Sequence, residues 1–190
     1  MFEKKGVFEM DKFESIIVNA FKGEGIDLKD KYLDDGLIPL HIIASNVSLG
    51  IPTIFQKKVP ILLALRASCC IPIVFRPQRV GRHLYIDGGF MTNVLFKVIP
   101  TELHSETLAI SLIHSNPHIT PENVNSMSGI DYVYNLYKNA CLYEHLLNKH
   151  QNILSLYSQT KSGFEDPSTE QQKEMIETGK KLTRAFFRPA

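Results

Sequence analysis

Apolar positions at helical spacing define the first element that the sequence predicts. Residues 11–23 place a stripe of large apolar side chains on one face of a helix, and these are Phe13, Ile16, Ile17 and Phe21. Asp11 is expected to cap this helix, with Glu14 three residues later, and Gly23 is expected to end it.

The same periodicity predicts three more helices. Residues 59–70 should form a helix that opens with Pro60 and ends before Pro72, because proline suits the first turn of a helix but cannot continue one. Two long helical segments are predicted at residues 130–157 and 169–187, separated by a polar turn. The C-terminal part of the chain is therefore expected to be mostly helical.

Short runs rich in β-branched residues predict strands. Residues 37–46 have the pattern of a mostly buried strand, and residues 52–55 that of an edge strand. Residues 84–86 and 107–113 are predicted as two further strands. Strands that alternate with helices, followed by helices alone, indicate an α/β fold with a helical C-terminal flank. Since the strands are few and no βα unit opens the chain, we expect it to begin in the middle of a domain.

Composition and charge describe an ordinary globular protein. Of the 190 residues, 44% are hydrophobic and 22% are charged, which suffices for one core, and the formal net charge is +1. Basic residues form only short, scattered clusters along the chain. The charge pattern therefore argues against a nucleic-acid partner.

Cysteine usage and hydropathy bear on the compartment. An odd count of three cysteines, of which Cys69 and Cys70 are adjacent, does not suggest a disulfide framework or a zinc site. We interpret them as small buried thiols in a reducing compartment. The most apolar stretch, residues 59–75, is interrupted by Arg66 and Pro72, so it is not predicted to span a membrane. We expect a soluble protein.

Several catalytic and binding motifs are absent from the sequence. The eleven glycines never take the spacing of a G-x-S-x-G nucleophile elbow, a Walker-type phosphate loop or a dinucleotide-binding loop. The seven histidines have no convergent carboxylates or thiolates at metal-ligand spacing. We therefore predict neither a cofactor nor a metal ion.

The stretch HLYIDGGFMTN, residues 83–93, raises the main question about chemistry. An Asp-Gly pair between apolar residues is a strong hairpin signal, so Asp87 can be the corner of a turn. A carboxylate at the end of a strand can equally be a general base, and Gly88 and Gly89 beside it would let a substrate or a second backbone come close. The stretch by itself leaves both interpretations open.

From residue 38 onward, the order of features resembles the C-terminal half of a patatin-like phospholipase domain. In that family an Ala-Ser-x-x-x-Pro-x-x-Phe segment leads to a strand and an Asp-Gly-Gly turn. The matching residues here are Ala67, Ser68, Pro72 and Phe75, followed by Tyr85, Asp87, Gly88, Gly89 and Asn93. The resemblance covers residues 7–99 and extends over residues 105–187, whose last segment is similar to the helix that often closes such domains.

The resemblance implies a partial patatin-like three-layer α/β/α fold. Residues 1–104 would be the C-terminal half of the domain, and residues 105–190 its last strand and helical C-terminal region, packed on the same domain. It also implies ester hydrolysis by a serine–aspartate dyad, in which an elbow serine attacks the carbonyl and a glycine-rich loop binds the oxyanion. Asp87 would be the general base, and Gly88 and Gly89 would let the turn approach the nucleophile's strand.

Two departures from the family pattern bear on activity. The nucleophile elbow and the oxyanion loop are not among these residues, and Asn93-Val94-Leu95 stands where the family often has Asn-x-Pro. Ser68 lies at a helix end without a neighbouring glycine, so we interpret it as structural rather than as a substitute nucleophile.

We therefore expect a portion of a lipid acyl hydrolase, inactive alone, that an N-terminal half-domain on another chain could complete. The alternative is a non-catalytic lipid-binding or interaction domain derived from the same fold. In either case, the expected partner is a lipid or membrane-surface substrate. The expected location is the cytoplasm, with peripheral attachment to such a surface.

Overall fold

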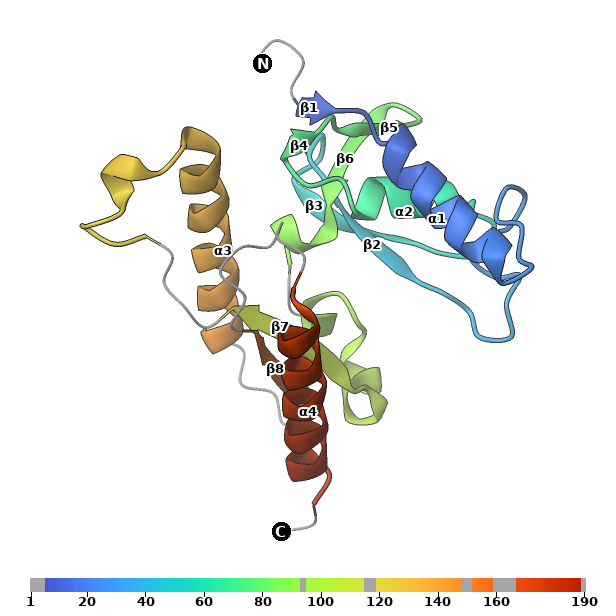
Figure 1. The fold of residues 1–190 in the computed structure, drawn as a ribbon. Helices are drawn as coiled ribbons and strands as arrows, with labels where there is room; N and C mark the ends of the chain where they lie inside the picture. The colour runs from blue at the N-terminus through green and yellow to red at the C-terminus, as the bar shows by residue number, and fades with distance from the viewer. Residues whose placement is uncertain (1–5, 93–94, 115–118, 148–151, 159–166, 189–190) are drawn as a thin grey trace. The chain divides into compact units, whose positions relative to one another are not determined.

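The computed structural model describes residues 6–92, 95–114, 119–147, 152–158 and 167–188. The backbone divides into two compact units, residues 1–92 and 93–190. Helices and strands alternate along the chain, which confirms the α/β class (Figure 1). The domain boundary expected after residue 104 stays a prediction.

The first unit is built on a four-stranded antiparallel sheet. Its strands lie in the order β3 (Ile51–Phe55), β2 (Ile42–Asn46), β6 (His83–Asp87) and β5 (Gln78–Val80). The strand predicted at residues 37–46 is β2 only over its last five residues. The prediction is wrong for residues 37–41, which precede the strand, and Leu37 and Ile38 are exposed rather than buried. Strand β3 is an edge strand as expected, with Pro52 in it. Each outer strand is joined by a short hairpin to the inner strand that it pairs with, β3 to β2 and β5 to β6.

Helix α2 (Ile61–Ser68) forms within the region 59–70 where the flanking prolines predict a helix. It packs on the two inner strands of this sheet. Its Ala64 and Ala67 are fully buried, and their small side chains lie in the core between the helix and the sheet. The core contains seven buried residues, which are Leu33, Ile42, Ala44, Phe55, Ala64, Ala67 and Tyr85. The rings of Phe55 and Tyr85 pack at a centroid distance of 5.2 Å.

Helix α1 (Asp11–Gly23) has the predicted bounds, but the predicted cap is wrong. The residue before the helix is the buried Met10, and no side chain caps the first turn. Asp11 instead directs its carboxylate to Arg66 of α2, so a tertiary ion pair has replaced the local capping bond. Ahead of α1, the short strand β1 (Gly6–Phe8) pairs in parallel with β4 (Ile73–Phe75), two strands that periodicity does not reveal.

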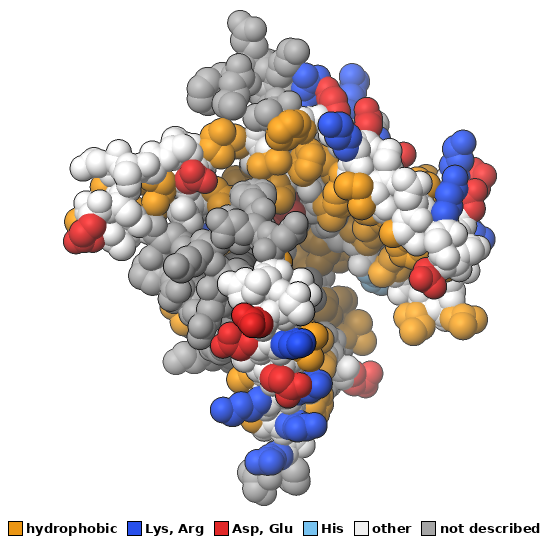
Figure 2. Space-filling view, in the orientation of Figure 1, with side chains coloured by type: hydrophobic (Ala, Val, Ile, Leu, Met, Phe, Trp, Pro, Cys, Tyr) orange, Lys and Arg blue, Asp and Glu red, His pale blue; other side chains and the backbone are white. Residues whose placement is uncertain are grey.

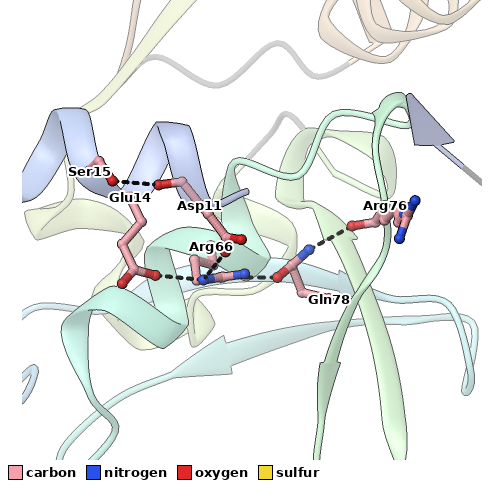
Figure 3. Close-up of polar contacts among 6 residues, drawn as sticks. All are labelled: Asp11, Glu14, Ser15, Arg66, Arg76 and Gln78. Atoms are coloured by element: carbon pink, nitrogen blue, oxygen red, sulfur yellow. Dashed lines mark hydrogen bonds and ion pairs between the residues drawn. The ribbon is translucent and has the colours of Figure 1, made fainter. Parts of the chain in front are cut away.

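Arg66 joins three elements of the first unit (Figure 3). Its Nη1 lies 2.7 Å from Glu14 Oε2 and 3.1 Å from Asp11 Oδ1, both on α1, and its Nε donates to Gln78 Oε1 on β5 at 3.1 Å. Burial by itself would lower the pKa of Arg66, but the hydrogen bonds and charges of Glu14 and Asp11 raise it above its ordinary value. This guanidinium therefore fixes α1 against α2 and the sheet edge.

The second unit contains a two-stranded parallel sheet, β7 (Ala109–His114) with β8 (Ile153–Ser158). Helix α3 (Gly129–Leu147) contacts β7 and helix α4 (Thr169–Phe186) contacts β8. Short 3-10 helices lie at Leu95–Lys97, Thr101–Glu106 and Val124–Ser126. The strand predicted at 107–113 and the last predicted helix are confirmed.

The helix predicted for residues 130–157 is wrong in its last part, because β8 is a strand. Six residues of β8 pair in register with the six of β7, from Ala109 with Ile153 to His114 with Ser158. The periodicity of a short apolar run does not distinguish a strand from a helix. Here the run forms a strand because it pairs with β7. Within the described ranges, no helix is both long enough and apolar enough to cross a membrane.

The Arg66 contacts lead to a first prediction. Replacing Arg66 by Met keeps the apolar stem but removes three polar contacts, so the free energy of unfolding should fall by about 1–3 kcal/mol. Urea unfolding followed by circular dichroism measures this loss. Arg79→Met on β5 is the matched control, because Arg79 is exposed and its Nε donates to the Gly81 carbonyl two residues away; it should change stability by less than about 0.5 kcal/mol. Equal effects of the two variants would contradict this role for Arg66.

Candidate functional site

Asp87 is the last residue of β6, opposite Ala44 of β2. Its backbone N–H donates to the Cys70 carbonyl at 2.8 Å, and its Oδ1 accepts the Gly89 N–H at 2.9 Å. The chain then enters a 3-10 turn, Gly88–Phe90, instead of returning as a second strand. Asp87 is therefore a turn residue, but the hairpin interpretation is wrong.

Gly88 lies against the backbone of β2. A Cβ atom built on Gly88 would lie 2.4 Å from the Ile43 carbonyl oxygen and 3.0 Å from its carbon. Since atoms do not approach so closely, and the obstacle is backbone, no other residue fits at this position without a shift of the strand. The glycine is needed for space and not, as a hairpin would require, for a positive φ.

Ser45 of β2 connects the turn to the sheet. Its side chain is fully buried, its Oγ donates to the Gly88 carbonyl at 3.2 Å, and the same oxygen accepts the Met91 N–H at 3.1 Å. The two bonds hold both ends of the turn that follows Asp87. The sequence contains no sign of this role, because the contact joins residues more than forty positions apart.

The end of α2 contacts the same turn. Ser68 Oγ donates to the Ile43 carbonyl at 2.7 Å, and the Cys70 carbonyl accepts the Asp87 N–H. The Ser68 hydroxyl is thus engaged with backbone of β2, which gives this serine a structural role. The matched segment Ala67 to Phe75 and the Asp-Gly-Gly turn, separate in sequence, are brought together here.

Burial raises the pKa of the Asp87 carboxyl, and the hydrogen bond from Gly89 only partly offsets this. Burial also raises the pKa of the Cys69 thiol, and that of Cys70 to about 11, with the nearby Asp87 charge adding to both. The carboxylate is therefore a stronger base than an exposed aspartate, while the two thiols stay protonated at neutral pH.

Two further points concern Asn93 and metal ligands. Asn93, which the family resemblance includes, lies outside the described residues. Among the residues that the structure describes, no three histidine, cysteine or carboxylate side chains gather where they could hold a metal ion.

Comparisons with known proteins place this geometry in context. A family model described as patatin-like phospholipase matches residues 1–99. The uncharacterized protein YqhO of Bacillus subtilis is 24% identical over an alignment 200 residues long, which covers 96% of this chain and 68% of that protein. The crystal structure of VipD from Legionella pneumophila aligns with a TM-score of 0.49 and 16% identity, and the match covers 77% of this chain but only 30% of the VipD chain.

The close approach of Gly88 predicts a large effect of one methyl group. Gly88→Ala should reduce the free energy of unfolding by about 2–4 kcal/mol, because the new Cβ must displace the β2 backbone. Gly23→Ala is the control, since a Cβ at Gly23 meets no atom within 4 Å and alanine suits the helix end. Chemical denaturation of both variants provides the comparison. A Gly88→Ala protein as stable as Gly23→Ala would show that the turn is not packed on β2 in this way.

The raised pKa of Asp87 predicts a pH-dependent effect of Asp87→Asn. Below the carboxyl's pKa in the unfolded chain, Asp87 is neutral in both states, so the variant and the parent should have similar stability. As the pH rises through the higher folded-state pKa, the parent must bury a charge and loses stability, whereas Asn does not. The stability of Asp87→Asn relative to the parent should therefore increase from pH 4 to pH 7 in denaturant titrations.

Asp27→Asn controls for the loss of one negative charge. Asp27 is exposed and accepts the N–H of the residue two positions on, as Asp87 does. A relative stability of Asp87→Asn that is flat with pH, or that falls, contradicts the desolvated carboxylate.

Proposed function

This chain belongs to the patatin-like phospholipase family, and from that premise we propose that it carries the general-base portion of a lipid acyl hydrolase. Asp87 is the proposed base. The serine nucleophile and the oxyanion-binding glycines are proposed to come from residues outside these 190, on an N-terminal half-domain. The chain alone would then bind lipid but not cleave it.

The observation that carries this proposal is the environment of Asp87. The carboxylate sits at a rigid strand end, its pKa is raised by burial, and glycines follow it in the order of the family's Asp-Gly-Gly turn. A base works best when its pKa lies near the working pH, so desolvation favours proton abstraction. Within the described ranges, Gly89 is the hydrogen-bond donor to this carboxylate, through Oδ1.

The proposed reaction has two steps, acylation of the serine and hydrolysis of the acyl-serine. Asp87 takes the hydroxyl proton as the serine oxygen bonds to the ester carbonyl carbon, and the proton passes to the departing alcohol when the ester bond breaks. Water then attacks the carbonyl carbon of the acyl-serine while Asp87 accepts a water proton, and this proton returns to the serine oxygen as the acyl–oxygen bond breaks and the fatty acid leaves. The Asx-type bond from Gly89 to Oδ1 fixes the carboxylate's orientation through both steps.

A completed enzyme tests the role of Asp87. The chain should be co-expressed with a segment that carries a glycine-rich loop and G-x-S-x-G from the coding sequence that precedes it. The assembly should hydrolyse phospholipid or acylglycerol esters, and the chain alone should not. Asp87→Asn should lower kcat by about a hundred- to ten-thousandfold, because the amide keeps the turn but cannot accept the proton.

Asp27→Asn is the matched control and should leave kcat within about twofold, since it removes an exposed carboxylate with the same local hydrogen bond. Labelling by a fluorophosphonate probe should appear only in the completed assembly. Full turnover in the Asp87→Asn assembly would refute the base. Stoichiometric labelling of the isolated chain would refute the missing nucleophile, and failure of every completed assembly would favour the non-catalytic domain.

A further inference from the structure

The loop that leads into β2 exposes two large aliphatic side chains. Leu37 is fully exposed and Ile38 is 83% exposed, and Leu40, which follows, is half exposed. Figure 2 shows hydrophobic side chains projecting from this loop at the lower right of the view. Apolar groups this exposed are costly in water, so a contact that buries them would be favourable.

This loop, residues 34–39, is closed and anchored at its base. The Leu40 N–H donates to the Leu33 carbonyl at 3.0 Å, and Leu33 itself is buried in the core of the first unit. Asp35 folds the first turn, since its Oδ2 accepts the Tyr32 N–H at 2.9 Å and its own N–H donates to the Tyr32 carbonyl. Leu37 and Ile38 are thus presented at the tip of an ordered loop.

The 34–39 loop and Asp87 lie at the same end of the main sheet. Ala44 near the start of β2 pairs with Asp87 at the end of antiparallel β6, so the segment before β2 and the turn after β6 leave the sheet at one end. Leu37 and Ala44 are seven positions apart in the chain, so their Cα atoms lie at most roughly 25 Å apart. Phe90, three residues after Asp87, is also half exposed at this end.

Charge at the loop argues against an electrostatic partner. Lys58 lies 3.3 Å from Asp34 and 3.9 Å from Asp35, and with the neighbouring Lys57 the four side chains sum to zero. A loop whose foot has no net charge and whose tip is apolar suits insertion into a neutral lipid surface, because attraction to anionic lipids needs excess lysine or arginine.

The size of the tip argues against a protein partner. Each aliphatic side chain offers roughly 100 Å² of apolar surface, whereas a stable dimer needs about 800 Å² from each partner. A projecting tip of two residues is small for an interface between copies, but a lipid layer accepts it without a complementary pocket.

We propose that the 34–39 loop inserts Leu37 and Ile38 into a neutral lipid surface and so brings the Asp87 end of the sheet to its ester substrate. The choice of lipid rests on the proposed function, but binding is measured without hydrolysis, so the two can fail separately. Hydrolysis that depends on Asp87, with vesicle binding indifferent to the loop, would overturn the insertion alone. Loop-dependent binding with no role for Asp87 would overturn the base alone.

Sedimentation with phosphatidylcholine vesicles provides the test on the 190-residue chain. The double variant Leu37→Ser, Ile38→Ser should bind at least about tenfold more weakly, because two aliphatic insertions are lost. The control is Val47→Ser with Leu49→Ser, which alters two exposed aliphatic residues in the β2–β3 turn at the opposite end of the sheet and should bind as the parent does. Raising the salt from about 0.1 to about 0.5 M should change parental binding less than twofold.

Three outcomes overturn the proposal. The first is that the parent chain fails to bind neutral vesicles, or binds only vesicles that contain phosphatidylserine. The second is that the loop and control variants lose vesicle binding equally. The third is that light scattering reveals self-association of the parent that only the loop variant abolishes. The last result would assign the tip to a second copy of the chain. Thermal melts by circular dichroism verify that both variants are folded; each replaces exposed residues, so neither should unfold.

Discussion

Between the turn after β6 and the backbone of β2 there is no room for a side chain, and the direction of Asp87 follows from that contact. Gly88 touches the Ile43 carbonyl region, so the turn can lie flat on the strand and Ser45 can reach both of its ends. Burial at this strand end raises the pKa of the Asp87 carboxyl. The position and the support of the proposed base therefore share one steric origin.

Support for this contact extends outward through α2. The two buried alanines lie between the helix and the sheet, where the helix end can bond to β2 through Ser68 and to β6 through the Cys70 carbonyl. Arg66, on the same helix, then holds α1 and the β5 edge (Figure 3). Helix α2 is thus the element through which the outer parts of the first unit reach the turn.

Much of this arrangement follows from local patterns in the sequence. Prolines around α2 and the apolar stripe of α1 predict these helices well, because each pattern is long or sharply bounded. The β-branched run locates β2 but starts the strand five residues early, because the apolar Leu37 and Ile38 extend the run into an exposed loop. Strands of three residues, such as β4 and β5, are too short to show a period, and β8 is defined by its partner strand. Asp87 stands out in the sequence because two glycines follow it, and Gly88 makes the close backbone approach that these glycines are expected to allow, without the positive φ of a hairpin. The supporting Ser45 is not found, because its contacts depend on strands paired across the chain.

The edges of the main sheet bear on how the protein behaves at high concentration. An exposed edge strand offers unpaired backbone groups on which a foreign strand can build a ladder, the usual start of edge-to-edge aggregation. At β3 that ladder meets Pro52, which has no N–H to donate, and at β5 it finds only three residues with the charged Arg79 at the centre. Both margins of the main sheet thus resist added strands, so the sheet that carries Asp87 can have exposed apolar residues beside it without its edges templating a ladder for other chains.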